Sequence, residues 1–267
     1  MPSLFLLAYR KGRPVCAVLV CVAAMFSSAG ARGQSATKEL RVAAAADLQA
    51  VMPAVAERYE RETKVKLVVS YGSSATLTTQ IVNGGPFDIF LAADFVHPEQ
   101  VVAAGLADAT APTPYARGTL VLWTRKDSGL LPLNMERLTD TKVKKIAVAN
   151  ELHAPYGRAA AEALRKLKLY DRVAPHLVVG EDVAQAAQFA ESGNAQLGLI
   201  SLTTASTAHF KELGTYVLVP TVYPVIRQCA VVLAKSERKA EAHVFLNWLL
   251  SPAIQAELPK LGLSPVE

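Results

Sequence analysis

Cysteine is scarce in this chain, with three among 267 residues. Cys16 and Cys21 lie near the N-terminus, and Cys229 lies in the apolar run 229–233. So few cysteines exclude a disulfide framework, and we expect Cys229 to be a buried thiol within a strand.

Long apolar runs and basic stripes are also missing. Beyond the N-terminus no stretch approaches the ~20 apolar residues of a membrane-spanning helix. No stripe of Lys and Arg alternates with aromatic residues, so nucleic-acid binding has no support. The five histidines lack metal-ligand spacing, and neither a Gly-x-Ser-x-Gly elbow nor a Gly-rich phosphate loop with lysine is present. These absences argue against an enzyme.

The N-terminus has the pattern of a secretory signal peptide. Arg10, Lys11 and Arg13 precede an apolar run over residues 14–26, and small residues then end at Ala31. We predict a signal peptide over residues 1–31, cleaved after Ala31, with a retained anchor as the alternative. Cleavage removes three basic residues and no acidic one, so the formal net charge falls from +5 to +2. The mature protein should be exported and nearly neutral.

Strand-like and helical patterns alternate along the rest of the chain. After a strand over 40–44, a helix is indicated by apolar residues at 48, 51, 52, 55, 56 and 59, which share one helical face. Further strands are expected at 65–70, 87–92, 119–125, 145–149, 176–179, 197–201, 215–219 and 229–234. Further helices are expected at 75–82, 97–104, 157–167, 183–190, 240–250 and 252–261. This alternation predicts an α/β fold with largely parallel sheets.

Two stretches resemble crossings between lobes. The Pro-rich stretch that ends near residues 116–118 and a second near 222–224 divide the chain. We therefore predict one lobe from residues 32–118 and 225–267 and another from residues 119–224. A ligand cleft is expected between them, at the carboxyl ends of strands where helices begin. A single continuous sheet is the alternative.

Four turns that run into helices are the strongest functional signal. They are Ala45-Ala46-Asp47, Gly72-Ser73-Ser74, Pro155-Tyr156-Gly157 and Gly180-Glu181-Asp182. A helix start leaves backbone N–H groups unpaired and carries partial positive charge, so converging starts form an anion site.

Each turn offers different chemistry to an anion. The Ser74 hydroxyl can donate without bringing a charge, and Tyr156 and Val183 can offer backbone N–H groups. Asp47 occupies the expected N-cap of the helix from Leu48. We expect neutral donors throughout, with Arg158 and Arg227 (near the cleft-facing segments) as the exceptions.

The ordered motifs resemble a known family. Ala-Ala-Ala-Asp-Leu, Gly-Ser-Ser-Ala-Thr-Leu, Phe-Asp-Ile-Phe-Leu-Ala-Ala-Asp, Pro-Tyr-Gly-Arg-Ala-Ala, Gly-Glu-Asp-Val and Leu-Gly-Leu-Ile-Ser occur in the order typical of periplasmic molybdate-binding proteins of ABC importers. The resemblance covers residues 38–264.

It implies a two-lobed, class II type periplasmic binding fold that captures molybdate or tungstate and delivers it to a membrane permease. The implied ligand positions are Asp47, Ser74, Tyr156, Val183 and Ser201. Of these, Ser74, Tyr156 and Val183 would act through the molybdate oxygens, without direct metal ligation. No cofactor is implied, and a monomer is the expected form.

Two positions depart from the commonest family pattern. Asp47 stands where many members have serine or another neutral polar residue, and Ser201 stands where some have tyrosine. An ionised carboxylate would repel a dianion in a closed cleft. We hypothesise that Asp47 caps its helix and offers mainly its backbone N–H. Alternatively, Asp47 accepts a proton from the ligand, which would favour phosphate, sulfate or a small organic acid. A ligand-sensing domain of a transcription regulator shares such folds, but the signal peptide and the missing helix-turn-helix argue against it.

Overall fold

The computed structural model describes residues 38–266. The predicted signal peptide, residues 1–31, lies outside this range. Within the described range no helix is both long and apolar enough to cross a membrane.

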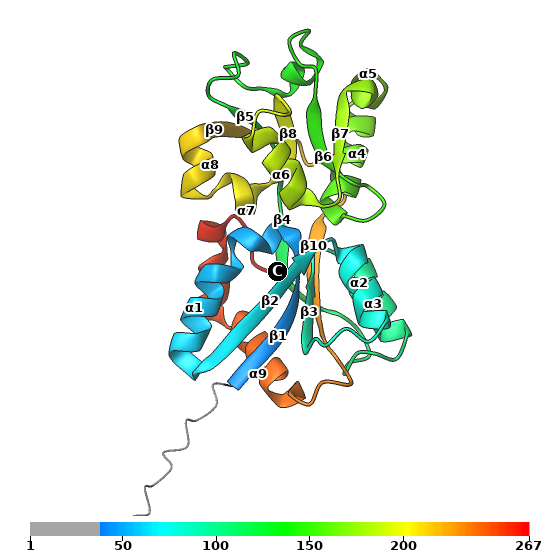
Figure 1. The fold of residues 1–267 in the computed structure, drawn as a ribbon, viewed down its shortest axis with the longest axis vertical. Helices are drawn as coiled ribbons and strands as arrows, with labels where there is room; N and C mark the ends of the chain where they lie inside the picture. The colour runs from blue at the N-terminus through cyan, green and yellow to red at the C-terminus, as the bar shows by residue number, and fades with distance from the viewer. Residues whose placement is uncertain (1–37, 267) are drawn as a thin grey trace, which may run out of the picture. The chain divides into compact units, whose positions relative to one another are not determined.

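The first sheet has five strands in the order β2-β1-β3-β10-β4 (Figure 1). Their bounds are β1 Lys38–Ala45, β2 Val65–Gly72, β3 Ile89–Ala92, β4 Thr113–Gly118 and β10 Ile226–Val232. β1 pairs in parallel with β2 and β3, whereas β10 runs antiparallel to β3 and β4. The sheet is therefore mixed, and its parallel strands end at one edge.

Alternation along β1 explains how helices cover both faces of this sheet. Leu40, Val42 and Ala44 pack in the core under α1 and α9, whereas Ala43 packs in the core under α2 and α3. The helices of this lobe, including two 3₁₀ segments (η), are η1 Ala46–Ala50, α1 Met52–Thr63, α2 Ser74–Val82, α3 Val96–Ala103, α9 Lys239–Leu249, α10 Pro252–Gln255 and η4 Leu258–Leu261.

The second sheet repeats this arrangement in the order β7-β6-β8-β5-β9. Its strands are β5 Leu120–Arg125, β6 Ile146–Ala149, β7 Leu177–Gly180, β8 Leu197–Ser201 and β9 Gly214–Leu218. β6 pairs in parallel with β7 and β8, and β5 runs antiparallel to β8 and β9. The flanking helices are η2 Met135–Thr139, α4 Pro155–Lys166, α5 Tyr170–Val173, η3 Ala174–His176, α6 Val183–Glu191, α7 Leu202–Ala205 and α8 Ala208–Leu213.

The two sheets confirm the two-lobed α/β fold and exclude a single continuous sheet. The chain passes to the second sheet between β4 and β5 and returns between β9 and β10. The described residues nevertheless form one compact unit, so the lobes are packed together. The exact lobe boundaries remain predictions.

Several local predictions need correction. The Pro-rich stretch before residue 118 is not a linker but strand β4. Proline is tolerated in this strand because β4 lies at the sheet edge and because Pro114 sits beside a register shift in the pairing. The helix expected from Leu48 is interrupted, with η1 ending at Ala50 and α1 beginning at Met52. α4 begins at Pro155, two residues earlier than expected, so Tyr156 belongs to its first turn. Cys229 is a free, buried thiol in β10, as predicted.

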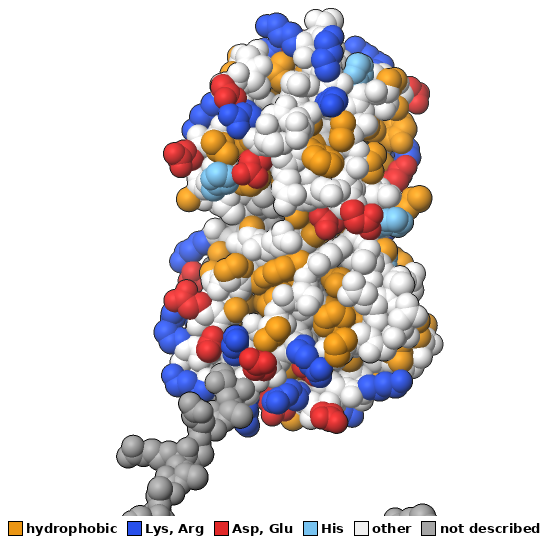
Figure 2. All heavy atoms as spheres, in the orientation of Figure 1, with side chains coloured by type: hydrophobic (Ala, Val, Ile, Leu, Met, Phe, Trp, Pro, Cys, Tyr) orange, Lys and Arg blue, Asp and Glu red, His pale blue; other side chains and the backbone are white. Residues whose placement is uncertain are grey.

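Charges of both signs are interspersed on the face of the molecule drawn in Figure 2. Lys and Arg side chains alternate there with Asp and Glu over both lobes, without a continuous basic stripe. This distribution agrees with the nearly neutral charge expected for residues after Ala31.

Candidate functional site

The four helix-start turns meet around one small cavity between the lobes. Its lining comprises Ala45, Ala46, Asp47, Gly72, Ser73, Ser74, Ala93, Ala154, Pro155, Tyr156, Asp182 and Val183. The cavity measures about 10 Å³, which is room for about one water molecule. The turns therefore lie almost against one another, and no Lys or Arg is among the lining residues.

Ser74 is positioned by the start of α2. Ser73 is the N-cap, and its Oγ accepts from the Thr76 backbone N–H at 3.1 Å. Ser74 is the first helical residue and is fully buried. Its Oγ accepts from the Ala93 backbone N–H at 3.2 Å. The Ser74 hydroxyl hydrogen is therefore left to donate into the cavity.

Backbone N–H groups from two further helices complete the donor set. Tyr156 is the second residue of α4, and Val183 is the first residue of α6. First-turn N–H groups have no intrahelical acceptor, and the described structure gives neither of these two another one. Asp182 caps α6 by accepting from Ala184 and Gln185 N–H at 2.9 Å, so it supports the Val183 position.

The Tyr156 side chain is buried rather than exposed to solvent. An added Cβ at Gly118 would overlap the Tyr156 hydroxyl, so glycine there lets the ring pass. The hydroxyl donates to Asp47 Oδ2 at 3.2 Å. Tyr156 thereby links the second lobe to the first while its backbone N–H faces the cavity.

Asp47 does not cap its helix, contrary to the hypothesis from the sequence. η1 begins at Ala46, so the N-cap is Ala45 and Asp47 is already helical, without a side-chain capping bond. Its buried carboxyl instead accepts from Tyr156 and from Gln228 Nε2, both at Oδ2. Oδ1 is buried without a partner. Burial, aided by the nearby Asp182 charge, raises the pKa of Asp47 to about 7, although hydrogen bonds from Gln228 and Tyr156 oppose this.

Ser201 is not among the residues that line the cavity. It ends β8 and caps α7, where its Oγ accepts from the Thr204 N–H at 3.4 Å. Its Oγ also lies 2.8 Å from Thr203 Oγ1, which donates to the Asp47 carbonyl oxygen at 2.8 Å. Ser201 thus reaches the site only through Thr203.

Sequence reasoning missed Thr203 and Gln228. Both contact Asp47 from far along the chain, at separations of 156 and 181 residues. The available signal for Gln228 was an amide directly before the apolar run 229–233. Polar groups in such positions are buried only with partners.

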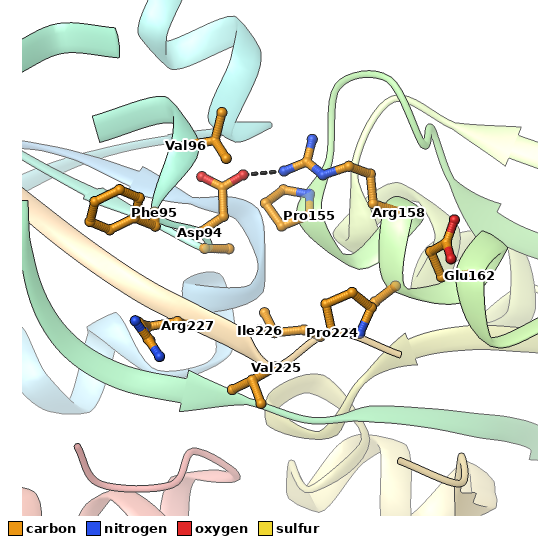
Figure 3. Close-up of a pocket in the computed structure, with 12 residues that line it drawn as sticks. Asp94, Phe95, Val96, Pro155, Arg158, Glu162, Pro224, Val225, Ile226 and Arg227 are labelled. Carbon is orange, nitrogen blue, oxygen red and sulfur yellow. Dashed lines mark hydrogen bonds and ion pairs between the residues drawn. The ribbon is translucent and has the colours of Figure 1, made fainter. Parts of the chain in front are cut away.

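Arg158 and Arg227, the expected charged exceptions, lie at a larger cavity of about 480 Å³ that adjoins the small one and shares Ala93 and Pro155 with it. Figure 3 shows Arg158 of α4 pointing to Asp94, with which it forms an ion pair between the lobes. Asp94 also contacts His97 Nδ1 at 2.8 Å. Arg158 is therefore engaged by a carboxylate, and the small cavity keeps neutral donors.

Further bonds join the lobes beside the small cavity. The Ala75 N–H donates to the His153 carbonyl at 3.2 Å, and Thr76 Oγ1 donates to Glu181 Oε1 at 3.0 Å. His153 Nδ1 lies 3.2 Å from the same Glu181 oxygen. Among residues 38–266 no group of three or more His, Cys, Asp or Glu could hold a metal ion. The small cavity is lined by hydrogen-bond donors and by no Lys or Arg side chain.

Comparison with known proteins agrees with this geometry. The family of bacterial extracellular solute-binding proteins matches residues 40–264. The chain is 37% identical over 215 residues to the molybdate-binding protein ModA of Azotobacter vinelandii, covering 80% of this chain and 85% of that protein. It is 32% identical over 229 residues to ModA of Rhodobacter capsulatus, covering 85% of this chain and 89% of that one.

A solved structure supports the same relationship. The periplasmic molybdate-binding protein of Azotobacter vinelandii matches with a TM-score of 0.81 and 32% identity, over 85% of this chain and 100% of that one. These relatives are binding proteins and not enzymes. The chain belongs to the family of bacterial extracellular solute-binding proteins.

Proposed function

We propose that this protein binds molybdate or its analogue tungstate outside the cytoplasm and delivers the anion to the membrane permease of an ABC importer. The observation that carries the proposal is the convergence of helix starts from both lobes on a cavity without a cationic side chain. Helix N-termini and neutral hydroxyls favour a small oxyanion. The names of the relatives supply the molybdate assignment.

In this proposal the Ser74 hydroxyl and the backbone N–H groups of Tyr156 and Val183 donate to molybdate oxygens. Asp47 lies at the same cavity, and Ser201 acts indirectly by holding Thr203 against Asp47. The anion is larger than the present cavity, so the lobes part for its entry and close again around it. A monomer, exported through a signal peptide cleaved after Ala31, completes the proposal.

A calorimetric ligand panel tests the substrate. The purified protein is titrated with molybdate, tungstate, sulfate and phosphate at matched ionic strength. We expect molybdate and tungstate to bind far more tightly than the other two. Tight binding of phosphate without binding of molybdate would overturn the molybdate assignment. It would favour the alternative receptor, in which Asp47 accepts a proton from the ligand.

A further inference from the structure

The Asp47 carboxyl has an uneven set of partners. Only 1% of the residue is exposed. Its Oδ2 atom accepts from the Tyr156 hydroxyl on α4 and from the Gln228 amide on β10. Its Oδ1 atom is buried with no hydrogen-bond partner, although Asp47 lines the cavity. An unpaired carboxylate oxygen in such a place would be costly.

A proton on Oδ1 removes the buried charge, and an anion oxygen placed against it would supply the missing hydrogen-bond partner. In a neutral carboxylic acid the carbonyl oxygen accepts hydrogen bonds, and Oδ2 already does so twice. The hydroxyl of the acid is then Oδ1–H, a donor at the cavity. The same atom would be a repulsive negative charge if it faced a dianion while ionised.

Burial and a nearby like charge favour the neutral form of Asp47, whereas hydrogen bonds from Gln228, Tyr156 and its own backbone favour the ionised form. Asp182, ahead of α6, adds a like charge, and Tyr115 on β4 and Tyr156 on α4 are buried phenols whose own pKa values are raised by burial. α7 contributes Thr203 through its hydroxyl and has no titratable side chain. On β10, Arg227 lines the larger cavity rather than this one. Burial already raises the pKa of Asp47 to about 7.

We propose that binding of the anion is coupled to uptake of one proton from solvent by Asp47, whose Oδ1–H then donates to an oxygen of the anion. This inference rests on the function proposed above and assigns Asp47 a specificity role at that site. The anion stays fully deprotonated, and the proton is carried by the protein. Asp47 thus becomes a neutral donor like Ser74 and the backbone groups.

Proton coupling fixes the direction of the pH dependence. Above the pKa of Asp47 in the free protein, each bound anion requires one proton, so the dissociation constant rises about tenfold per pH unit. Below that pKa the carboxyl is already neutral, and affinity is independent of pH. Molybdate is a dianion throughout the neutral and alkaline range, so its own titration does not contribute there.

Calorimetry with sodium molybdate tests the coupling. Titrations at several values between about pH 6 and pH 9, each in two buffers of different ionisation enthalpy, give the number of protons taken up. For the unmodified protein we expect uptake to approach one proton at the alkaline end, with the tenfold loss of affinity per unit. Asp47→Asn carries a permanent neutral donor, so we expect no uptake and a constant dissociation constant.

Asp171→Asn is the matched control. It makes the same acid-to-amide change on an exposed residue of α5, which does not line the cavity. We expect it to retain proton uptake. The proton count of the unmodified protein is informative even without any variant.

The outcomes separate this inference from the function on which it rests. Molybdate binding without proton uptake at any pH, or uptake that persists in Asp47→Asn, would overturn the role of Asp47 and leave the function intact. Absence of molybdate binding at every pH, in both the unmodified protein and Asp47→Asn, would overturn the proposed function itself.

Discussion

At the residue scale, the site depends on a few buried polar atoms with defined partners. Ser74 Oγ accepts from the Ala93 N–H and keeps its hydrogen, whereas the neighbouring Ser73 uses its oxygen to cap α2. In our proposal the adjacent serines therefore have different roles, with Ser74 binding the ligand and Ser73 capping the helix.

Substitution Ser74→Ala should weaken molybdate binding, and it should also lower stability because the buried Ala93 N–H loses its acceptor. A hydrogen bond to a charged group contributes about 1.5–3 kcal/mol, which corresponds to an affinity loss of roughly 10- to 150-fold. Calorimetric titration measures the loss. Ser192→Ala, at the exposed end of α6, is the matched control and should bind as the unmodified protein does. An unchanged affinity in Ser74→Ala would remove this residue from the site.

Asp47 should also make the stability of the ligand-free protein depend on pH. Its pKa in the folded state is raised to about 7, whereas an unfolded aspartate titrates near 3.9. A raised carboxyl pKa lowers stability once the group ionises. This destabilisation is absent below about pH 4, grows as the pH rises toward about 7, and is constant above that.

Asp47→Asn should therefore be more stable than the unmodified protein at neutral pH, by at most about 4 kcal/mol. This gain in stability should vanish at about pH 4, where the aspartic acid and the asparagine at position 47 are both neutral. The stability difference of about 4 kcal/mol is a maximum, because parting of the lobes would hydrate the carboxyl and lower its pKa toward the unfolded value. Urea unfolding without ligand at several pH values measures the difference, and a difference that does not vary with pH would contradict the raised pKa.

At the element scale, the helix starts place the donors. α4 begins against the end of β6, and Gly157 makes this close approach possible. A Cβ on Gly157 would run into the Asn150 carbonyl oxygen and lie 2.6 Å from that of Ala149. The close packing of glycine against backbone holds the Tyr156 N–H at the cavity.

Gly157→Ala should destabilise the protein by at least about 1–3 kcal/mol, the range typical of overpacking. It should also weaken molybdate binding, because the first turn of α4 must move. Gly105→Ala is a useful comparison, since nothing lies near its added Cβ and only its positive φ is unfavourable. That variant should cost about 1–2 kcal/mol and leave binding unchanged. If Gly157→Ala and Gly105→Ala bound molybdate equally well, the start of α4 would have no role in ligand binding.

The sequence predicted most elements and all four turns because these signals are local. Apolar periodicity and capping residues identified α2 and α6, and buried runs identified β3 and β8. β4 escaped prediction because proline usually signals a break, while pairing at a sheet edge is decided by distant residues.

The rest of the site could not be predicted because it too depends on contacts between residues that are distant in the sequence. Whether Asp47 caps a helix or reaches Gln228 and Thr203 depends on the exact start of η1 and on contacts between the lobes. No local pattern around residue 47 encodes those contacts. Local signals therefore located the helix starts that carry the candidate donors, but they did not predict the contacts of the Asp47 carboxyl.

At the scale of the whole molecule, direct bonds join the two lobes at the interface where we propose that the anion binds. The Asp94–Arg158 ion pair, the Thr76–Glu181 bond and the Tyr156–Asp47 bond all join the lobes. An anion held by donors from both lobes adds to these contacts. Ligand binding should therefore stabilise the protein as a whole.

Molybdate at about 100 times its dissociation constant should stabilise the folded state by about 2.7 kcal/mol. For a chain of this size the Tm should rise by roughly 5–10 °C. Scanning calorimetry with molybdate, and with sodium nitrate at equal ionic strength, measures how much of the rise in Tm is specific to molybdate. An identical rise in both salts would indicate an ionic-strength effect and not a bound ligand.

The central claim is that the starts of α2, α4 and α6 hold the anion, and a crystal structure grown with molybdate tests it most directly. We predict the strong density of molybdenum between the lobes, with its oxygens within hydrogen-bonding distance of Ser74 Oγ and the backbone N–H groups of Tyr156 and Val183. Density at the larger cavity beside Arg158 and Arg227, or none between the helix starts, would contradict the account.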